Sequence, residues 1–72
     1  MTYILHFGTR KLIATVETFR TSSGFIASFT DNISGTVTER PYKTQTAIKA
    51  QATRYFDKLH RLYFAAWEAG KI

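Results

Sequence analysis

The last third of the chain carries apolar side chains at helical spacing, and this pattern constrains the fold more than any other feature. The repeat runs from Thr44 to Ala69 and predicts one long amphipathic helix. Thr44 is a suitable N-cap, because its hydroxyl can accept a hydrogen bond from a free amide of the first turn, and Gly70 is a suitable C-terminal stop. The residues of the stripe are Ile48, Ala52, Tyr55, Leu59, Leu62, Tyr63, Ala66 and Ala69.

The segment before this helix alternates between two faces with the period of β-strands. Strands are predicted over residues 3–7, 11–20, 25–30 and 36–40, with turns between them where glycine, serine, asparagine and aspartate gather. Pro41 is expected to end the last strand, because proline has no backbone N–H to donate to a sheet. The sets that share one face are Tyr3, Leu5 and Phe7, then Leu12, Ala14, Val16 and Thr18, and then Phe25, Ala27 and Phe29. For the second strand, we expect Leu12, Ala14, Val16 and Thr18 to face the core.

Short turns between consecutive strands favour an antiparallel meander. We therefore expect an α+β fold, in which a three- or four-stranded antiparallel meander packs against one long C-terminal helix in the order β-β-β-β-α. The chain of 72 residues is expected to form a single domain over residues 1–72, and it contains no cysteine, so no disulfide can stabilise it.

The helix is predicted to be longer than the sheet. At about 1.5 Å per residue a helix from Thr44 to Ala69 is about 39 Å long, whereas a strand of about six residues spans about 20 Å. The helix should then overhang, bend or break, and Phe64 is expected to point away from the stripe. Three alternatives remain for the surplus aromatic residues at the C-terminal end of the helix. They contact a partner, or the helix breaks near residues 57–60 and its last turns fold back, or the first strand covers them. The residues predicted as a protein interface are Phe56, Tyr63, Phe64 and Trp67.

The charge of the chain favours an anionic partner, although it also serves solubility. Lysine and arginine number 10 against 5 acidic residues, which gives a net charge of +5. Basic residues recur on one helix face and at strand ends, and those predicted to bind nucleic acid are Arg10, Lys11, Arg20, Arg40, Lys43, Arg54, Lys58 and Arg61. The sheet face opposite the helix is expected to carry Thr15, Glu17, Phe19, Ser28 and Thr30, and Thr38 and Arg40 are further candidates for this face. Such a hydroxyl-rich face flanked by arginines could enter a DNA groove.

Catalysis, a metal site and a cofactor are not expected. His6 and His60 lie far apart, and no metal-binding motif accompanies them. The five acidic residues are scattered, and there is no nucleophile elbow or glycine-rich phosphate loop. We therefore expect no enzymatic activity and no small-molecule substrate. The N-terminal residues lack the features of a signal peptide, and no apolar run is long enough to span a membrane, which favours a cytoplasmic protein without a membrane partner.

The Tyr42-Lys43-Thr44 corner resembles the aromatic-x-Thr that leads from the last strand into the helix in DNA-binding domains of the ethylene-response-factor type. The layout is also similar to the arm-site-binding domains of tyrosine recombinases. The resemblance covers residues 11–59 in pattern and implies a sheet that enters the major groove. It departs from these families at residues 46–48, where Thr-Ala-Ile replaces the usual acid and paired alanines. The tryptophans and arginines that contact DNA in the plant family have no equivalents, so no base-contacting residue is carried over.

Two hypotheses follow. The first is a small, basic, non-catalytic protein that binds nucleic acid through basic residues of the sheet face and helix, with a salt-dependent affinity. The alternative is a small phage or mobile-element protein that binds and inhibits a host protein complex, as anti-CRISPR proteins do. The exposed aromatics of the helix would then carry the binding energy, because aromatics dominate interface hot spots. The same residues could instead form a homodimer.

Overall fold

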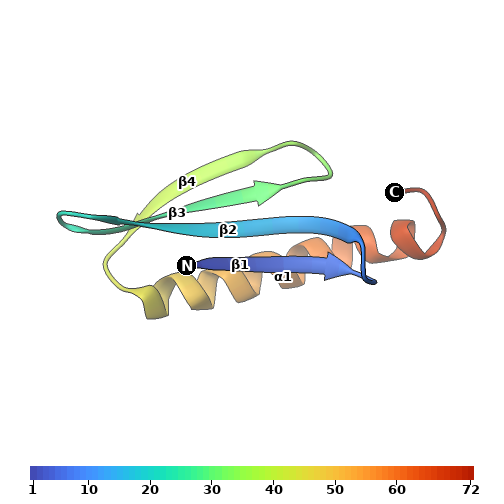
Figure 1. The fold of residues 1–72 in the computed structure, drawn as a ribbon. Helices are drawn as coiled ribbons and strands as arrows, with labels where there is room; N and C mark the ends of the chain where they lie inside the picture. Colours follow the sequence, from blue (N-terminus) through green and yellow to red (C-terminus); the bar gives the residue numbers. More distant parts are fainter.

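The computed structural model describes residues 1–72 and shows four strands followed by one C-terminal helix (Figure 1). The strands form a single antiparallel sheet in the order β1-β2-β3-β4. The elements are β1 (Thr2–Phe7), β2 (Lys11–Thr21), β3 (Gly24–Asp31), β4 (Val37–Tyr42) and α1 (Gln45–Glu68). The predicted α+β fold is confirmed, with the four-stranded form of the sheet.

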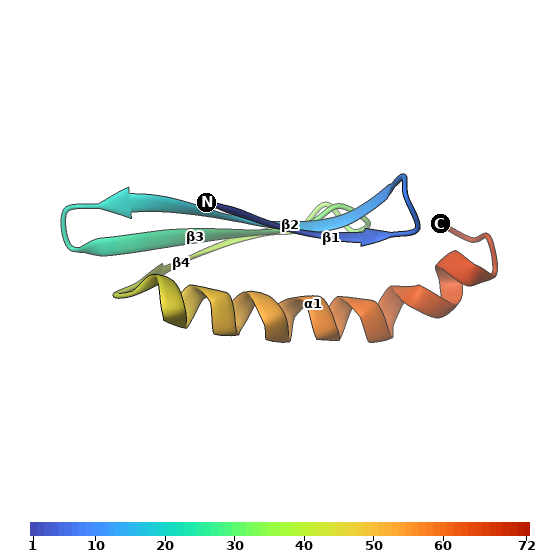
Figure 2. The ribbon, with the colours of Figure 1, turned by 60° about the horizontal axis from the view of Figure 1, so that its bottom comes forward.

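The helix lies against one face of the sheet, so the molecule has two layers (Figure 2). Its predicted ends are confirmed. The Thr44 hydroxyl accepts a 3.2 Å hydrogen bond from the amide of Ala47. At the other end Gly70 adopts a left-handed φ of 74°. The amides of Gly70 and Lys71 then donate to carbonyl oxygens of the last turn, at 3.0 and 2.8 Å, in a Schellman arrangement.

The assumed difference in length between helix and sheet is wrong, because β2 is longer than the strand assumed, but the expected overhang and bend are both seen (Figure 2). It has 11 residues, which at about 3.3 Å each span about 36 Å. The helix has 24 residues and at about 1.5 Å each has about the same length. The helix is continuous, but it is offset along the sheet, so the β2–β3 hairpin extends beyond its first turn and its last turns pass the β1–β2 turn and curve toward the sheet (Figure 2).

A β-bulge changes which side of β2 is buried. Leu5 pairs with Ala14, but the next residue of β1, His6, pairs with Leu12, so Ile13 has no partner. The extra residue reverses the alternation at this point. Ile13 is completely buried, while Leu12 is 39% exposed on the opposite face. The prediction that Leu12 faces the core is therefore wrong, whereas Ala14 and Val16 are buried as expected.

The last strand does not end at Pro41. It continues to Tyr42, and Pro41 pairs with Ile26 of β3. β4 lies at the edge of the sheet, and an edge strand tolerates a residue without an N–H, because only one side of the strand needs donors.

The buried core consists of two clusters along α1. The first core cluster joins the N-terminal half of the helix to β2 and β3, and its members are Val16, Ala27, Phe29, Ile48 and Ala52. The second core cluster lies under the β1–β2 end of the sheet, and its members are Phe7, Ile13, Ala14 and Leu59. Tyr55 and Phe56 pack against both clusters, so the helix is anchored along most of its length.

The apolar stripe winds around the helix. From Leu59 it passes to Tyr63 and Trp67, which pack on the second core cluster. Each step of four residues turns the stripe by about 40° at about 100° per residue. Leu62 lies off this path and is 59% exposed. The prediction that Leu62 belongs to the buried stripe is therefore wrong, since it assumed a stripe that runs straight along the axis.

Candidate nucleic-acid interface

The register of β4 decides on which side of the sheet its polar side chains lie. Thr38 pairs with Phe29 and Arg40 pairs with Ala27, and both partners belong to the first core cluster. Directly paired residues point to the same face of a sheet, so Thr38 and Arg40 lie on the side of α1. The prediction that they belong to the opposite face is wrong. Every residue of β4 except Tyr42 is exposed. The sequence of this strand therefore lacks the apolar side chains that would indicate which of its faces lies toward the helix.

Arg20 also lies on the helix side. It pairs with Phe25, and its guanidinium carbon is 5.9 Å from the centre of the Phe25 ring. The ring packs against the first core cluster, and this cation–π contact holds the arginine at the hairpin end of the sheet.

The sheet face opposite α1, which we call the open face, contains none of the ten lysines and arginines that the sequence provides. The expected positions of Thr15, Phe19 and Thr30 on this face are confirmed. Glu17 pairs with Ser28, and Ser28 pairs with Glu39, so two carboxylates lie in one row across three strands. The open face is therefore acidic, while the positive charge lies on the helix side, in the turns and beyond the strand ends.

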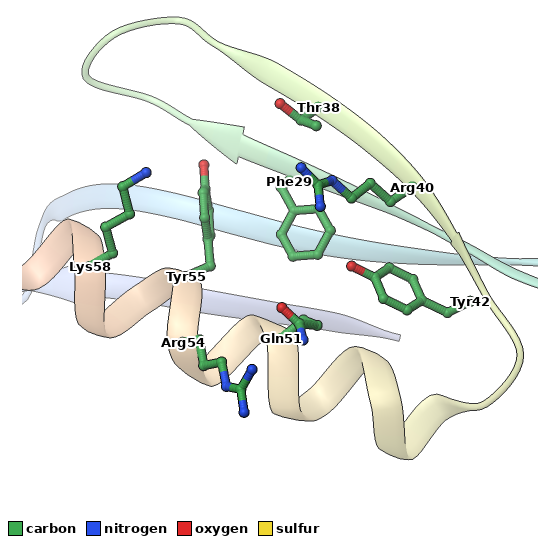
Figure 3. Close-up of a pocket in the computed structure, with 8 residues that line it drawn as sticks. All are labelled: Phe29, Thr38, Arg40, Tyr42, Gln51, Arg54, Tyr55 and Lys58. Atoms are coloured by element: carbon green, nitrogen blue, oxygen red, sulfur yellow. The ribbon is translucent and has the colours of Figure 1, made fainter.

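Three basic residues line a groove between β4 and α1 (Figure 3). Arg40 comes from β4, and Arg54 and Lys58 come from successive turns of the helix. The groove has a volume of about 310 Å³, and no carboxylate lines it. In Figure 3 the side chains of Arg40 and Lys58 extend into the space between strand and helix, while Arg54 extends away from the sheet at the outer rim.

Aromatic rings form the inner wall of the groove. Phe29 contacts two tyrosines, with ring centres 6.3 Å from Tyr42 and 5.3 Å from Tyr55. Phe29 is only 6% exposed and belongs to the first core cluster, so the wall is continuous with the core. Both tyrosines are partly buried, and together with Gln51 and Thr38 they add polar groups to the lining.

The Tyr55 hydroxyl stays protonated at neutral pH. Burial raises the pKa of Tyr55 above its ordinary value of 10.0, and the negative charges of Asp31 and ionised Tyr63 raise it further. A protonated phenol can donate a hydrogen bond to an anion. The groove thus offers two guanidinium groups, an ammonium group and tyrosine hydroxyl groups, which suits oxyanions.

The remaining predicted basic residues lie elsewhere. Arg61 is exposed on α1 beyond Lys58, outside the residues that line the groove. Lys43 follows β4 and lines a separate hollow beside the β2–β3 hairpin. Arg10 and Lys11 lie at the β1–β2 turn, at the other end of the sheet (Figure 1). Of the predicted basic residues, Arg40, Arg54 and Lys58 are therefore the ones that line the groove. Thr38, Tyr42, Gln51 and Tyr55 were not predicted as groove residues, because no local pattern in the sequence shows which face of β4 lies toward the helix.

The aromatics predicted as a protein interface pack within the fold. Phe64 lies edge-on to Phe7 with ring centres 5.4 Å apart, and Trp67 lies 5.7 Å from the same ring. The prediction that Phe64 points away from the stripe is wrong. Of the three alternatives for this end of the helix, the structure shows the one in which the first strand covers the aromatics. Phe56, Tyr63, Phe64 and Trp67 are each half-buried against the second core cluster.

No group of three or more histidine, cysteine, aspartate or glutamate side chains lies close enough together to hold a metal ion. The helix is not apolar enough to cross a membrane.

No protein-family model, curated protein or solved structure matches the chain. The distribution of charge and the groove are therefore the basis on which its function is inferred.

Proposed function

We propose that this protein binds nucleic acid, without catalysing a reaction, through phosphate contacts in the groove between β4 and α1. The observation that carries the proposal is that Arg40, Arg54 and Lys58 line one groove in which no carboxylate is present. These cations come from two different elements, and an anionic ligand bound along the groove would be attracted by all three.

The groove chemistry fits a phosphodiester chain. Arginine can donate two parallel hydrogen bonds to a phosphate, and lysine supplies a mobile positive charge. The hydroxyls of Tyr42 and Tyr55 lie beside these cations and can donate to phosphate or sugar oxygens. Arg61, exposed on the same helix beyond Lys58, would meet the next phosphates along the chain.

The proposal differs from the docking mode that the resemblance implied. In the ethylene-response-factor and recombinase families the sheet enters the major groove, but here Glu17 and Glu39 lie on that face. Carboxylates repel phosphates, so the helix side is the favourable surface. The net charge of +5 adds long-range attraction toward a polyanion.

The test is fluorescence anisotropy with labelled duplex and single-stranded DNA of mixed sequence, repeated over a series of salt concentrations. The variant Arg54→Gln/Lys58→Gln removes two groove cations. A matched control, Arg10→Gln/Lys71→Gln, removes the same charges from exposed positions outside the groove. The groove variant should bind at least about tenfold more weakly, and its slope of log affinity against log salt should be smaller by about one to two. The control variant should lose much less.

Two outcomes would contradict the proposal. Equal losses in both variants would mean that the protein attracts DNA by net charge alone and has no groove site. Absence of binding by the wild-type protein at low salt would exclude a nucleic-acid function for the basic residues.

A further inference from the structure

The open face combines exposed apolar side chains with acidic ones. Five large apolar residues are solvent-exposed there: Ile4 (54%), Leu12 (39%), Phe19 (49%), Ile26 (36%) and Val37 (60%). Only Met1 and Leu62, among the other large apolar residues of the molecule, are comparably exposed. Such a concentration on one face, with no element of the chain covering it, is typical of an interaction surface.

The side chains of this face are arranged in rows across the strands. Phe19, Ile26 and Pro41 are in direct register and form an apolar row at the hairpin end. Glu17 and Glu39 lie in the adjacent row, on either side of Ser28. Since neighbouring strands are about 4.8 Å apart and alternate residues about 7 Å apart, the two carboxylates are separated by about 10 Å and lie about 7 Å from the apolar row.

The charges on the face exclude several occupants. A polyanion or an anionic membrane surface would be repelled by Glu17 and Glu39. A second copy packed by twofold symmetry would place the same patch on both sides, which brings four carboxylates into one interface with no lysine or arginine. Unpaired charges that lose water in an interface are strongly unfavourable. The complementary surface is apolar and positively charged.

We propose that the open face is a docking site for a protein partner that presents an amphipathic segment with apolar and basic side chains. Apolar side chains of the partner cover the row of Phe19 and Ile26, and lysines or arginines pair with Glu17 and Glu39. Basic residues seven positions apart on a helix are about 10.5 Å apart, which matches the separation of the two carboxylates. The site lies on the face of the sheet turned away from α1, whereas the basic groove lies on the helix side (Figure 2), and it is independent of the nucleic-acid proposal.

The test uses a synthetic amphipathic helical peptide of leucine and lysine, with a leucine and glutamate peptide of the same apolar pattern as the control. Titration of 15N-labelled protein with the lysine peptide should shift the amide signals of the open face around Glu17, Phe19 and Ile26. The glutamate peptide should cause no such shifts. The variant Phe19→Thr/Ile26→Thr should bind the lysine peptide at least about tenfold more weakly, since it removes the central apolar contacts.

The charge contribution is measured separately. Glu17→Gln/Glu39→Gln keeps the shape of the face, and we expect it to weaken binding of the lysine peptide several-fold and to make that binding less sensitive to salt. Circular dichroism establishes that each variant is folded, and threonine is well tolerated in strands. Equal binding of both peptides, or shifts confined to the helix, would overturn the proposal. Concentration-dependent dimerisation of the wild type that is lost in Phe19→Thr/Ile26→Thr would also overturn it, since a second copy would then cover the face.

Discussion

The Tyr63 hydroxyl donates a 2.7 Å hydrogen bond to Oδ2 of Asp31 and so ties the C-terminal half of α1 to the end of β3. Asp31 is only 7% exposed. Its other carboxylate oxygen, Oδ1, accepts hydrogen bonds from the amides of Ile33 and Ser34, at 2.9 and 3.0 Å, and shapes the β3–β4 turn. One carboxylate thus joins the turn to the helix.

Removal of the Tyr63 hydroxyl should destabilise the fold. In Tyr63→Phe the buried Asp31 loses a partner, and the free energy of unfolding should fall by about 1 kcal/mol, which lowers Tm by about 4–8 °C in a domain of this size. Thermal unfolding followed by circular dichroism measures the change. Tyr3→Phe is the matched control, because no hydrogen bond of the Tyr3 hydroxyl is seen. Equal loss in both variants would contradict a special role for the Tyr63–Asp31 contact.

Stability should fall in acid because of the same carboxylate. Burial alone would raise the pKa of Asp31, but the hydrogen bonds from Tyr63, Ser34 and Ile33 outweigh it and hold the pKa below its ordinary value of 3.8. The contribution to stability is therefore complete above 3.8 and is lost as the pH falls through the lower pKa of the folded state. Urea unfolding at a series of pH values should show a smaller acid-induced loss for Asp31→Asn than for wild type. Parallel curves would show that Asp31 does not contribute.

Gly8 in the β1–β2 turn should resist substitution for two reasons. Its φ is +63°, and a Cβ at this position would lie 3.0 Å from Cζ2 of Trp67. Gly35 has a similar φ of +79°, but a Cβ there would meet no atom within 4 Å. Gly35→Ala should therefore cost about 1–2 kcal/mol for the backbone conformation alone, and Gly8→Ala should cost more. Equal costs in urea unfolding would mean that Trp67 does not pack against this turn.

The winding of the apolar stripe predicts opposite outcomes for two neighbouring leucines. Leu59 is 3% exposed and Leu62 is 59% exposed. Leu59→Ala should reduce the free energy of unfolding by about 2–5 kcal/mol, whereas Leu62→Ala should change it by less than about 0.5 kcal/mol. Both substitutions are leucine to alanine within one helix, so helix propensity is matched. A large loss from Leu62→Ala would contradict the winding.

The features that follow from the spacing of apolar residues could be predicted from the sequence. The helix, its caps at Thr44 and Gly70, and the sets of residues that share a face in β1 and β3 each follow from local patterns. The bulge at Ile13 was not predictable, because an alternating strand gives no sign that one residue lacks a cross-strand partner. The face of β4 that lies toward the helix could not be predicted either, since five of the six residues of the strand are exposed.

The candidate groove could be predicted only in part. Arg54 and Lys58 share a helix face, which spacing alone indicates. That Arg40 and Tyr42 join them depends on the register of β4 and on the side of the sheet that the helix covers. Neither is encoded in a local pattern, so the prediction from sequence assigned Arg40 to the wrong face.

The central claim is that the basic groove and the acidic, apolar surface lie on opposite faces of the sheet, and that nucleic acid contacts only the basic groove. Titration of 15N-labelled protein with single-stranded and duplex DNA, followed by amide chemical shifts, tests it most directly. The shifts should concentrate around Thr38, Arg40, Gln51, Arg54 and Lys58, the residues of the groove. Shifts that concentrate instead around Thr15, Glu17 and Phe19 would show that DNA binds the open face and would contradict the claim.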